Sequence, residues 1–427
     1  MESKTKIAIV SVIVIVVIVA AAVAIFAGGN EDKYEPPTSG DIGSGVIYGN
    51  VDGNSVIDST DLETIQRIIS GELDFADYPL ADANLDGTVD EDDVAIVQAV
   101  IDGENTTLSV VDVNDEIVPV SYPVTNYAFT SGTNMKSIIA VLGLYDSISA
   151  IAIDTETLSP ALDSGLSAAI DSGKVKTLTE DSQKLTTESI NILVDEGVRL
   201  VIGEDTGMTS DSEIVAAMEQ LGITFLPMNT KDKDLQINAI NTLGILLGCE
   251  DRAGSYSSWI QQICDEITDN EGDRAGTVTV LSVVMTNSVS GTSSDYYAAT
   301  TLAGGKNLAD WEKSTQKFNK GDTWLLDAKY DADYIFHFRT VTYPDGLSDE
   351  EIANYASYFE NTSTYQDGGY YLINGSLPLP VRLAVMAETM YSDCFEEGWA
   401  ESVFQEYVTE FLGVDYNVSQ GIYIWNA

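Results

Sequence analysis

Two acidic stretches near the start of this 427-residue chain carry oxygen side chains at regular intervals. A loop with oxygens at positions 1, 3, 5, 7, 9 and 12 can surround Ca²⁺, which takes 6–8 oxygen ligands. Gly87 stands at position 6, where such a loop turns sharply, and Thr88 at position 7 offers its backbone carbonyl. The alternative is an acidic turn without metal. The predicted ligands of this stretch are Asp82, Asn84, Asp86, Thr88, Asp90 and Asp93.

The upstream stretch is a weaker copy of the same loop. Ser55 replaces the glycine, and three carboxylates stand where the downstream loop has four, so we expect weaker Ca²⁺ binding. Position 12 is aspartate in both loops, where EF-hands usually have glutamate. An acidic turn without metal is again the alternative. Its predicted ligands are Asn50, Asp52, Asn54, Val56, Asp58 and Asp61.

The two stretches belong to a repeat of 32 residues in which apolar positions recur in phase with the acidic ones. When the predicted ligands and the apolar face of a helix recur with the same spacing, the repeat is typical of a duplicated structural unit. Residues 46–105 resemble a dockerin-type domain, a small all-α EF-hand-like fold with two calcium loops, each followed by a helix. Dockerins bind cohesins, so the resemblance implies a cohesin-like partner. The apolar positions in phase are Leu62, Ile65 and Ile69 with Val94, Val97 and Ile101.

Net charge excludes one class of partner. The chain has 20 Lys and Arg against 68 Asp and Glu, a formal net charge of −48. Such a surface repels phosphate backbones, so nucleic-acid binding is disfavoured. Apolar residues make up 44%, enough for a large core, and the length suits two or three domains.

The N-terminus contains a run of 21 uncharged residues, 7–27. Twenty apolar residues in a helix span the hydrocarbon layer of a bilayer. Lys4 and Lys6 precede the run and acidic residues follow it, which predicts a single-pass anchor in the cell membrane with the soluble domains extracytoplasmic. A cleaved signal peptide is the alternative.

Beyond the repeat, helices alternate with short apolar strands. A helix over 187–196 ends at Gly197 before the strand 198–202, and a capping box at 210–213 opens the next helix. This alternation indicates parallel sheets covered on both faces, here two Rossmann-like lobes joined by a long helix. Cys249, Cys264 and Cys394 are expected to be free thiols. The predicted parts are the anchor 1–29, a linker 30–45, the calcium module 46–105, lobe 1 at about 107–233, connecting helices at about 234–270 and lobe 2 at about 275–427.

Several stretches of the region 107–427 carry a likeness to a known family, in the same order along the chain. They are 111–119, 138–144, 187–202, 221–223, 243–248 and the Ala-Gly-Gly-Lys-Asn segment of 302–308. Through them, residues 107–427 resemble the class III substrate-binding proteins of ABC importers, which take siderophores, cobalamin or haem. The resemblance implies that the chain captures such a metal chelate and delivers it to a permease. We expect this domain and the calcium module to have separate cores.

Open α/β sheets bind ligands outside the carboxyl ends of their strands, so the cleft residues should follow strands. His337, the single histidine, can ligate a metal or haem iron, although a packed histidine at a strand end is more common. Arg339 can hold an anionic group or form a surface ion pair. Tyr296 and Tyr297 can stack on a flat chelate or pack in the core. The candidates are Ser131, Asn134, Glu204, Asp205 and Met208 in lobe 1, and Asn287, Tyr296, His337, Arg339, Tyr343 and Asn374 in lobe 2.

The resemblance also implies an acidic residue on each lobe that contacts the permease. Glu188 matches the first, whereas no glutamate falls in register around 322–324 for the second. We find no nucleophile elbow, P-loop or zinc signature, and the chain is not expected to be an enzyme. The rival hypothesis is a cell-surface attachment or scaffold protein that uses the dockerin-like module and whose lobes no longer bind ligand.

Overall fold

The computed structural model describes residues 43–426, apart from 131–132, 180–184, 205–211, 319–326, 328–329 and 345. These residues belong to one compact unit, 37–427. Among them, no helix is both long and apolar enough to cross a membrane. The predicted anchor and most of the predicted linker lie outside the described residues.

The N-terminal module contains the same unit twice, an acidic loop followed by a helix of 11 residues. The helices are α3 (Ser59–Ile69) and α4 (Glu91–Ile101), with a 3-10 turn, η1 (Phe75–Asp77), between them. Each helix begins with a capping box made by two aspartates of its loop, at positions 9 and 12. This is the duplicated order that the sequence repeat predicts.

A short extended segment joins the module to the rest of the chain. Ile47 forms an antiparallel bridge with Val110 of β1 (Thr106–Val111), and β1 continues as a hairpin into β2 (Ile117–Tyr122). The Tyr48 N–H also donates to the Ser109 carbonyl at 3.0 Å. The module is thus hydrogen bonded to the first hairpin of the following domain.

The module and the following domain share a hydrophobic core, so the expectation of separate cores is wrong. Val97 and Val100 of α4 are buried in the same cluster of side chains as Leu108 and Val110 of β1. The reason is the hairpin, which turns apolar side chains toward α4 that a free-standing domain would leave in water.

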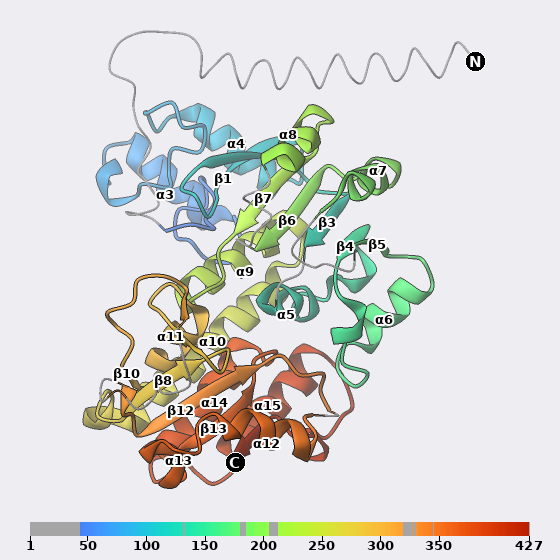
Figure 1. Ribbon diagram of the computed structural model, residues 1–427. Helices are drawn as coiled ribbons and strands as arrows, with labels where there is room; N and C mark the ends of the chain where they lie inside the picture. The colour runs from blue at the N-terminus through green and yellow to red at the C-terminus, as the bar shows by residue number, and fades with distance from the viewer. Residues whose placement is uncertain are drawn as a thin grey trace. The chain divides into compact units, whose positions relative to one another are not determined.

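The first lobe is a five-stranded parallel sheet in the order β5-β4-β3-β6-β7 (Figure 1). Alternate residues of its strands pack on opposite faces: Phe129 lies in one hydrophobic cluster with Ile138 of α5, and Ala128 in another with Leu193 of α7. Both faces are buried, as the continuous apolar strands predict. The elements are β3 (Tyr127–Thr130), α5 (Thr133–Val141), η2 (Leu144–Asp146), β4 (Ala150–Ala152), η3 (Thr155–Thr157), α6 (Ser164–Asp171), β5 (Lys176–Thr179), α7 (Thr187–Asp195), β6 (Leu200–Glu204), α8 (Ser212–Gln220) and β7 (Thr224–Met228).

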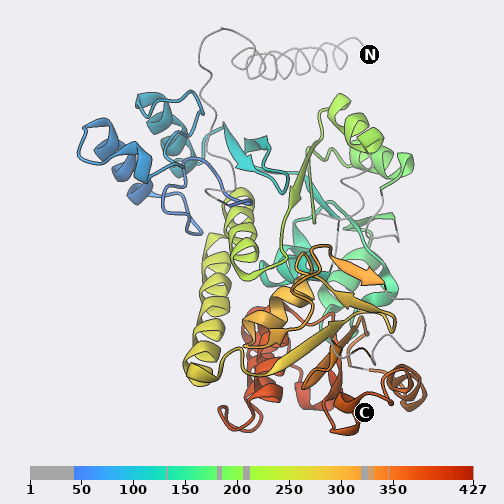
Figure 2. The same cartoon turned by 60° about the vertical axis from the view of Figure 1, so that its left-hand side comes forward.

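Two helices connect the lobes, α9 (Lys233–Leu247) and α10 (Glu250–Glu271), and Figure 2 shows them side by side. The break between them is Gly248, which has a left-handed backbone with φ of +68°. The two helices lie so close at Gly244 that an added Cβ would stand 2.5 Å from the Ala253 Cβ. All three cysteines are free, as expected.

The second lobe is a five-stranded sheet in the order β10-β8-β12-β13-β14, parallel except for the last strand. Helices α11 and α14 pack on one face, and α12 packs on the other. The elements are η4 (Gly272–Arg274), β8 (Thr279–Val283), β9 (Ser288–Ser290), α11 (Asp295–Leu302), β10 (Lys306–Asn307), β11 (Gln316–Phe318), β12 (Tyr334–Arg339), α12 (Asp349–Ser357), α13 (Ser363–Gln366), β13 (Tyr370–Asn374), α14 (Leu379–Met390), α15 (Trp399–Glu406), a π-helical turn (Tyr407–Phe411), η8 (Val418–Gln420) and β14 (Ile424–Asn426).

Candidate functional site

The two lobes meet at a buried arginine. Arg382, in the first turns of α14, is 1% exposed. Its Nη1 donates to Asp295 Oδ2 of lobe 2 at 3.0 Å, and its Nη2 donates to Asn134 Oδ1 of lobe 1 at 2.9 Å. Its guanidinium lies 5.2 Å from the centre of the Tyr296 ring, over the ring face. One charged side chain therefore ties both lobes together at the carboxyl ends of their strands.

On the lobe 1 side, Glu204 is the last residue of β6, and its side chain is hydrogen bonded to the first turn of α5. Its Oε1 accepts hydrogen bonds from the Met135 backbone N–H at 2.8 Å and from Thr230 Oγ1 at 2.9 Å. Asn134 Nδ2 donates to the Thr230 carbonyl at 3.2 Å. Burial raises the pKa of Glu204 above its ordinary value, and the hydrogen bonds from Thr230 and Met135 oppose that rise.

One hydrogen-bond donor of the cluster, Nε of Arg382, has no acceptor among the described residues, although this atom is buried. Tyr296, whose ring stacks on Phe338 with centroids 4.3 Å apart, covers one side of the guanidinium. A buried cation with an unused donor beside an aromatic face can take an anionic or polar group of a ligand.

A second inter-lobe contact lies beside this cluster. Ser159 Oγ of lobe 1 donates to the Tyr343 carbonyl of lobe 2 at 2.5 Å. A cavity of about 40 Å³ next to it is lined by both lobes, including the Lys136–Asp163 ion pair, whose Nζ and Oδ2 are 2.9 Å apart. This volume holds one or two water molecules.

Several predicted cleft residues come together in this arrangement, namely Asn134, Glu204 and Tyr296. Tyr343 also lies at the contact, but its hydroxyl is used inside lobe 2, where it donates to the Val418 carbonyl at 2.6 Å. The predicted candidates Ser131, Asp205 and Met208 lie outside the described residues.

His337 lies inside lobe 2, fully buried, rather than on the cleft surface. Its Nδ1 is 2.9 Å from the Tyr370 hydroxyl, and its Nε2 is 3.2 Å from the Val284 carbonyl. Burial lowers its pKa to about 3, so the ring is neutral at physiological pH. Both ring nitrogens have hydrogen-bond partners within the lobe. This arrangement matches the alternative interpretation, a histidine packed at the end of a strand.

Of the other lobe 2 candidates, Arg339 and Asn374 border the cluster, and hydrogen bonds within lobe 2 hold their side chains. Arg339 donates from Nη1 to the Val284 carbonyl at 3.2 Å and lies 4.7 Å above the Tyr355 ring. The Asn374 side chain accepts a hydrogen bond from the Val341 N–H and donates one to the Val341 carbonyl, which fixes the loop after β12. Asn287 is exposed in the turn before β9, and Tyr297 is half-buried on α11.

Sequence reasoning missed Arg382, Asp295 and Thr230. A signal for Arg382 was present, because it interrupts an otherwise apolar run at the start of α14. A charged residue on a buried helix needs partners, and these are usually found at a functional or interdomain contact. Its partner Asn134 is 248 residues away, a separation that no local pattern reveals.

In the first acidic loop, side chains of predicted ligands accept hydrogen bonds from the loop backbone. Asp61 Oδ1 accepts from the Val51 N–H at 2.7 Å, and Asn54 Oδ1 accepts from the Val56 N–H at 2.7 Å. Within the described part of the chain, no donor reaches Oδ1 of Asn50, an atom that is buried. An orphaned buried oxygen at position 1 fits a loop built for a cation.

The second loop has the same arrangement. Asp82 is fully buried, and its two carboxylate oxygens accept from the Asp86 N–H at 3.2 Å and the Gly87 N–H at 2.9 Å. Burial raises the pKa of Asp82 to about 6 and also raises that of Asp93. Taken over the described residues, no group of three His, Cys, Asp or Glu side chains has a metal-binding arrangement. The predicted ligand sets also use amide and backbone oxygens.

Glu188 is exposed in the first turn of α7, as predicted. Thr186 caps this helix in a capping box with Ser189, so the helix start does not depend on the Glu188 carboxylate. The segment 322–324, where a second docking residue was sought, lies outside the described residues.

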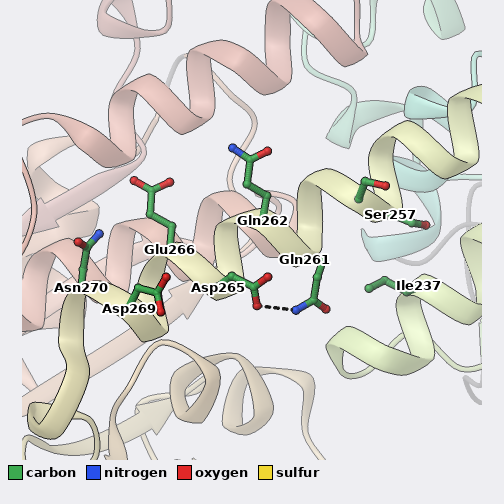
Figure 3. Close-up of a pocket in the computed structure, with 9 residues that line it drawn as sticks. Ile237, Ser257, Gln261, Gln262, Asp265, Glu266, Asp269 and Asn270 are labelled. Atoms are coloured by element: carbon green, nitrogen blue, oxygen red, sulfur yellow. Dashed lines mark hydrogen bonds between the residues drawn. The ribbon is translucent and has the colours of Figure 1, made fainter.

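An open groove of about 830 Å³ lies on the connecting helices (Figure 3). It is acidic, with Asp265, Glu266 and Asp269 along α10. Gln261 Nε2 donates to Asp265 Oδ1 at 2.7 Å within it. The groove follows the connector and is distinct from the polar cluster between the lobes.

Comparison with solved structures identifies the fold. CeuE of Helicobacter pylori with Ni(II) bound matches with a TM-score of 0.57 and 15% identity, over 73% of this chain and 98% of that chain. The TroA-like periplasmic binding protein FepB of Veillonella parvula matches with a TM-score of 0.56 and 15% identity, over 74% and 99%. MolA of Haemophilus influenzae, bound to molybdate, matches with a TM-score of 0.56 and 13% identity, over 72% and 98%.

Sequence comparison adds nothing to this, because no family model and no curated protein matches the chain. At identities below 20%, the likeness of the solved structures is one of fold. The two lobes and their helical connector have the mixed α/β fold, with parallel sheets, of TroA-like periplasmic solute-binding proteins.

Proposed function

We propose that this chain is an extracytoplasmic solute-binding protein that captures a metal chelate of the siderophore, cobalamin or haem type and delivers it to an ABC importer. The observation that carries the proposal is the polar cluster at the carboxyl ends of both sheets, where Arg382 joins Asn134 and Asp295 over the face of Tyr296. Ligands of open α/β sheets bind at such edges.

The chemistry of this cluster favours a ligand with an anionic or hydrogen-bonding rim and a flat surface. The unused Nε of Arg382 offers a charged donor, and Tyr296 offers an aromatic face. Glu204 of lobe 1 accepts hydrogen bonds from the Met135 N–H and from Thr230 Oγ1 and so fixes the start of α5 at the site. A chelate with carboxylate or catecholate groups matches this set.

Native mass spectrometry of residues 31–427 tests the proposal directly. The protein is mixed with haem, cobalamin or a ferric siderophore, and we expect a one-to-one adduct with one of these ligands. Arg382→Lys should weaken that adduct, because lysine lacks the fork and the Nε donor. Arg67→Lys, on an exposed helix of the module, should leave it unchanged and serves as the matched control. The absence of any adduct would count against chelate capture.

A second candidate function is surface attachment, with lobes that no longer take a ligand. One observation favours it: the lobes touch directly through Arg382 and Asn134, and the cavity beside that contact is only about 40 Å³. An attachment protein should bind none of the chelates and should be retained on a cohesin-like partner in a calcium-dependent manner. The dockerin-like module is the part proposed to make that contact.

We further propose that the two acidic loops bind Ca²⁺. Each loop has oxygens at the positions that the ion requires. In the first loop, the buried Asn50 Oδ1 has no donor among the described residues, and in the second, the Asp82 carboxylate is buried without a cationic side chain of the described chain beside it. Bound Ca²⁺ would give the amide oxygen a partner and would offset the charge of the carboxylate. Isothermal titration with calcium tests the assignment, with Asp82→Asn combined with Asp86→Asn expected to abolish the tighter binding step.

Delivery requires a permease and a position near it. Glu188, exposed at the start of α7, is the proposed docking residue, where its carboxylate would meet an arginine. The uncharged run 7–27 is the proposed membrane anchor that holds the soluble domains outside the cell. Protease accessibility on intact cells distinguishes this location from a cytoplasmic one.

A further inference from the structure

The connector helix α9 carries a polar stripe that faces the N-terminal module. Asn238, Asn241 and Thr242 stand at i, i+3 and i+4, which is one face of a helix. Their side chains all donate to backbone carbonyls at the N-terminal end of the described chain. Asn238 donates to Ser44 at 3.2 Å and Thr242 to Gly45 at 2.7 Å, both in the last residues of the linker, and Asn241 donates to Gly53 of the module at 3.2 Å. The stripe is therefore a docking face inside the chain.

Asn241 also connects the first acidic loop to α10. Its Nδ2 donates to the carbonyl of Gly53, which lies in the loop, and its Oδ1 accepts from Ser257 Oγ of α10 at 2.8 Å. Asn241 and Ser257 are buried, with 7% and 8% of their surface exposed. A buried amide with both ends engaged holds its two partners in a fixed relation.

Ser55 makes a second contact between the same loop and α10. It occupies position 6 of the loop, and a Cβ added to Gly254 would lie 2.6 Å from its hydroxyl. A side chain at position 254 would therefore force the Ser55 hydroxyl to rotate away from α10. Asp58, Asp61 and the other predicted ligands flank Gly53 and Ser55 on both sides, so a cation that orders the loop would also order both contacts.

We propose that the first acidic loop, residues 50–61, is a cation-dependent clamp on the connector: a divalent cation bound there fixes Gly53 and Ser55 and thereby stabilises α9 and α10. This inference rests on the proposed Ca²⁺ binding of the loop. The buried Asn50 Oδ1, for which the described residues offer no donor, is the independent sign that the loop takes a cation. Because α9 and α10 join the two lobes, calcium would act on the hinge of the binding protein.

Hydrogen exchange in the full chain, with Ca²⁺ or with a chelator, tests the clamp. We expect calcium to slow amide exchange in peptides covering 233–247 and 250–271 by about five- to tenfold, the range of a modest coupling between sites. Asp52→Asn with Asp58→Asn should remove this effect, and asparagine at 58 still caps α3. The matched control is Asp86→Asn with Asp90→Asn in the second loop, which should retain it.

Asn241→Ala separates coupling from binding. This variant should still bind calcium by titration, but calcium should no longer slow exchange in 250–271. Calcium binding in the unmutated chain without any change in connector exchange would overturn the clamp while leaving the calcium assignment standing. If the control variant of the second loop also lost the calcium-dependent slowing of exchange, the slowing could not be assigned to the first loop. If the titration shows no calcium binding at all, the calcium function itself fails, and the clamp fails with it.

Discussion

Arg382 shows how a single residue can define the contact between two lobes. A buried guanidinium is stable only with partners, and it has one charged partner in its own lobe, Asp295, and one neutral partner across the interface, Asn134. A neutral partner can be exchanged for a ligand group at lower cost than a charged one. We therefore expect the Asn134 contact, rather than the Asp295 pair, to yield when a ligand enters.

Replacing this arginine should destabilise the fold markedly. Arg382→Met leaves the Asp295 carboxylate without its cation and the buried Asn134 Oδ1 without its donor, which should lower the free energy of unfolding by about 2–4 kcal/mol. Urea denaturation measures it. Arg67→Met is the control, because the Arg67–Glu72 pair is largely exposed and should contribute less than about 1 kcal/mol. Equal effects of the two substitutions would contradict the assigned role of Arg382.

Glu271 is a second buried charge, at the end of α10. It is 3% exposed, and within the described chain no donor reaches its Oε1. The carboxylate lies against the backbone of Gly304, where any Cβ would collide with it, and burial raises its pKa to about 7. A carboxyl group in this position is stable in its protonated form.

The sign of the pH dependence follows from this raised pKa. The folded state holds the Glu271 proton more tightly than the unfolded chain does, so Glu271 lowers stability as pH rises from 4.5 to about 7. Glu271→Gln should therefore be more stable than the unmutated chain by up to about 3 kcal/mol at about pH 8, and equal to it at about pH 4. Thermal unfolding at both pH values checks this; a constant difference between them would remove titration as the cause.

At the scale of elements, local pattern predicts much of the fold. Strands such as β6 and β7 were predictable because parallel strands buried on both faces read as continuous apolar runs, and α7 because Gly197 ends it with a left-handed turn. The connector was predicted as connecting helices at about 234–270, and in the structure Gly248 separates α9 from the longer α10. A glycine followed by a new acidic first turn was the signal for that break.

Glu188 belongs to this scale because its role depends on where α7 places it. The capping box of Thr186 and Ser189 supports the helix start, so Glu188→Gln should cost less than about 1 kcal/mol of stability. A docking role predicts normal chelate affinity but reduced uptake by cells, with the defect larger at high salt. Glu213→Gln is the control, since Glu213 is also exposed in the first turn of a lobe 1 helix, α8. Uptake that is the same for both variants would remove Glu188 from the docking surface.

At the scale of the whole molecule, sequence reasoning was least informative. The contacts that join lobe to lobe and module to connector link residues 248 and 188 positions apart, as in Arg382 with Asn134 and Asn241 with Gly53. From the sequence, the polar side chains of Asn238, Asn241 and Thr242 are indistinguishable from a solvent-exposed face of α9, because a polar helix face can contact either water or a polar partner. Only the assembled fold distinguishes the two.

The shared core makes a prediction about the intact protein. A chain cut to 107–427 loses the strand pairing of Ile47 with Val110, uncovers Leu108 and Val110, and leaves the three polar side chains of α9 to water. Three hydrogen bonds at about 1 kcal/mol each, with the lost apolar burial, should lower its free energy of unfolding by about 3 kcal/mol or more. Calorimetry of 31–427 and 107–427 measures the difference, and 31–427 should unfold in one transition in which module and lobe 1 melt together. Two separate transitions, with the later one unchanged in 107–427, would mean that the module and the binding domain fold independently despite the contacts between them.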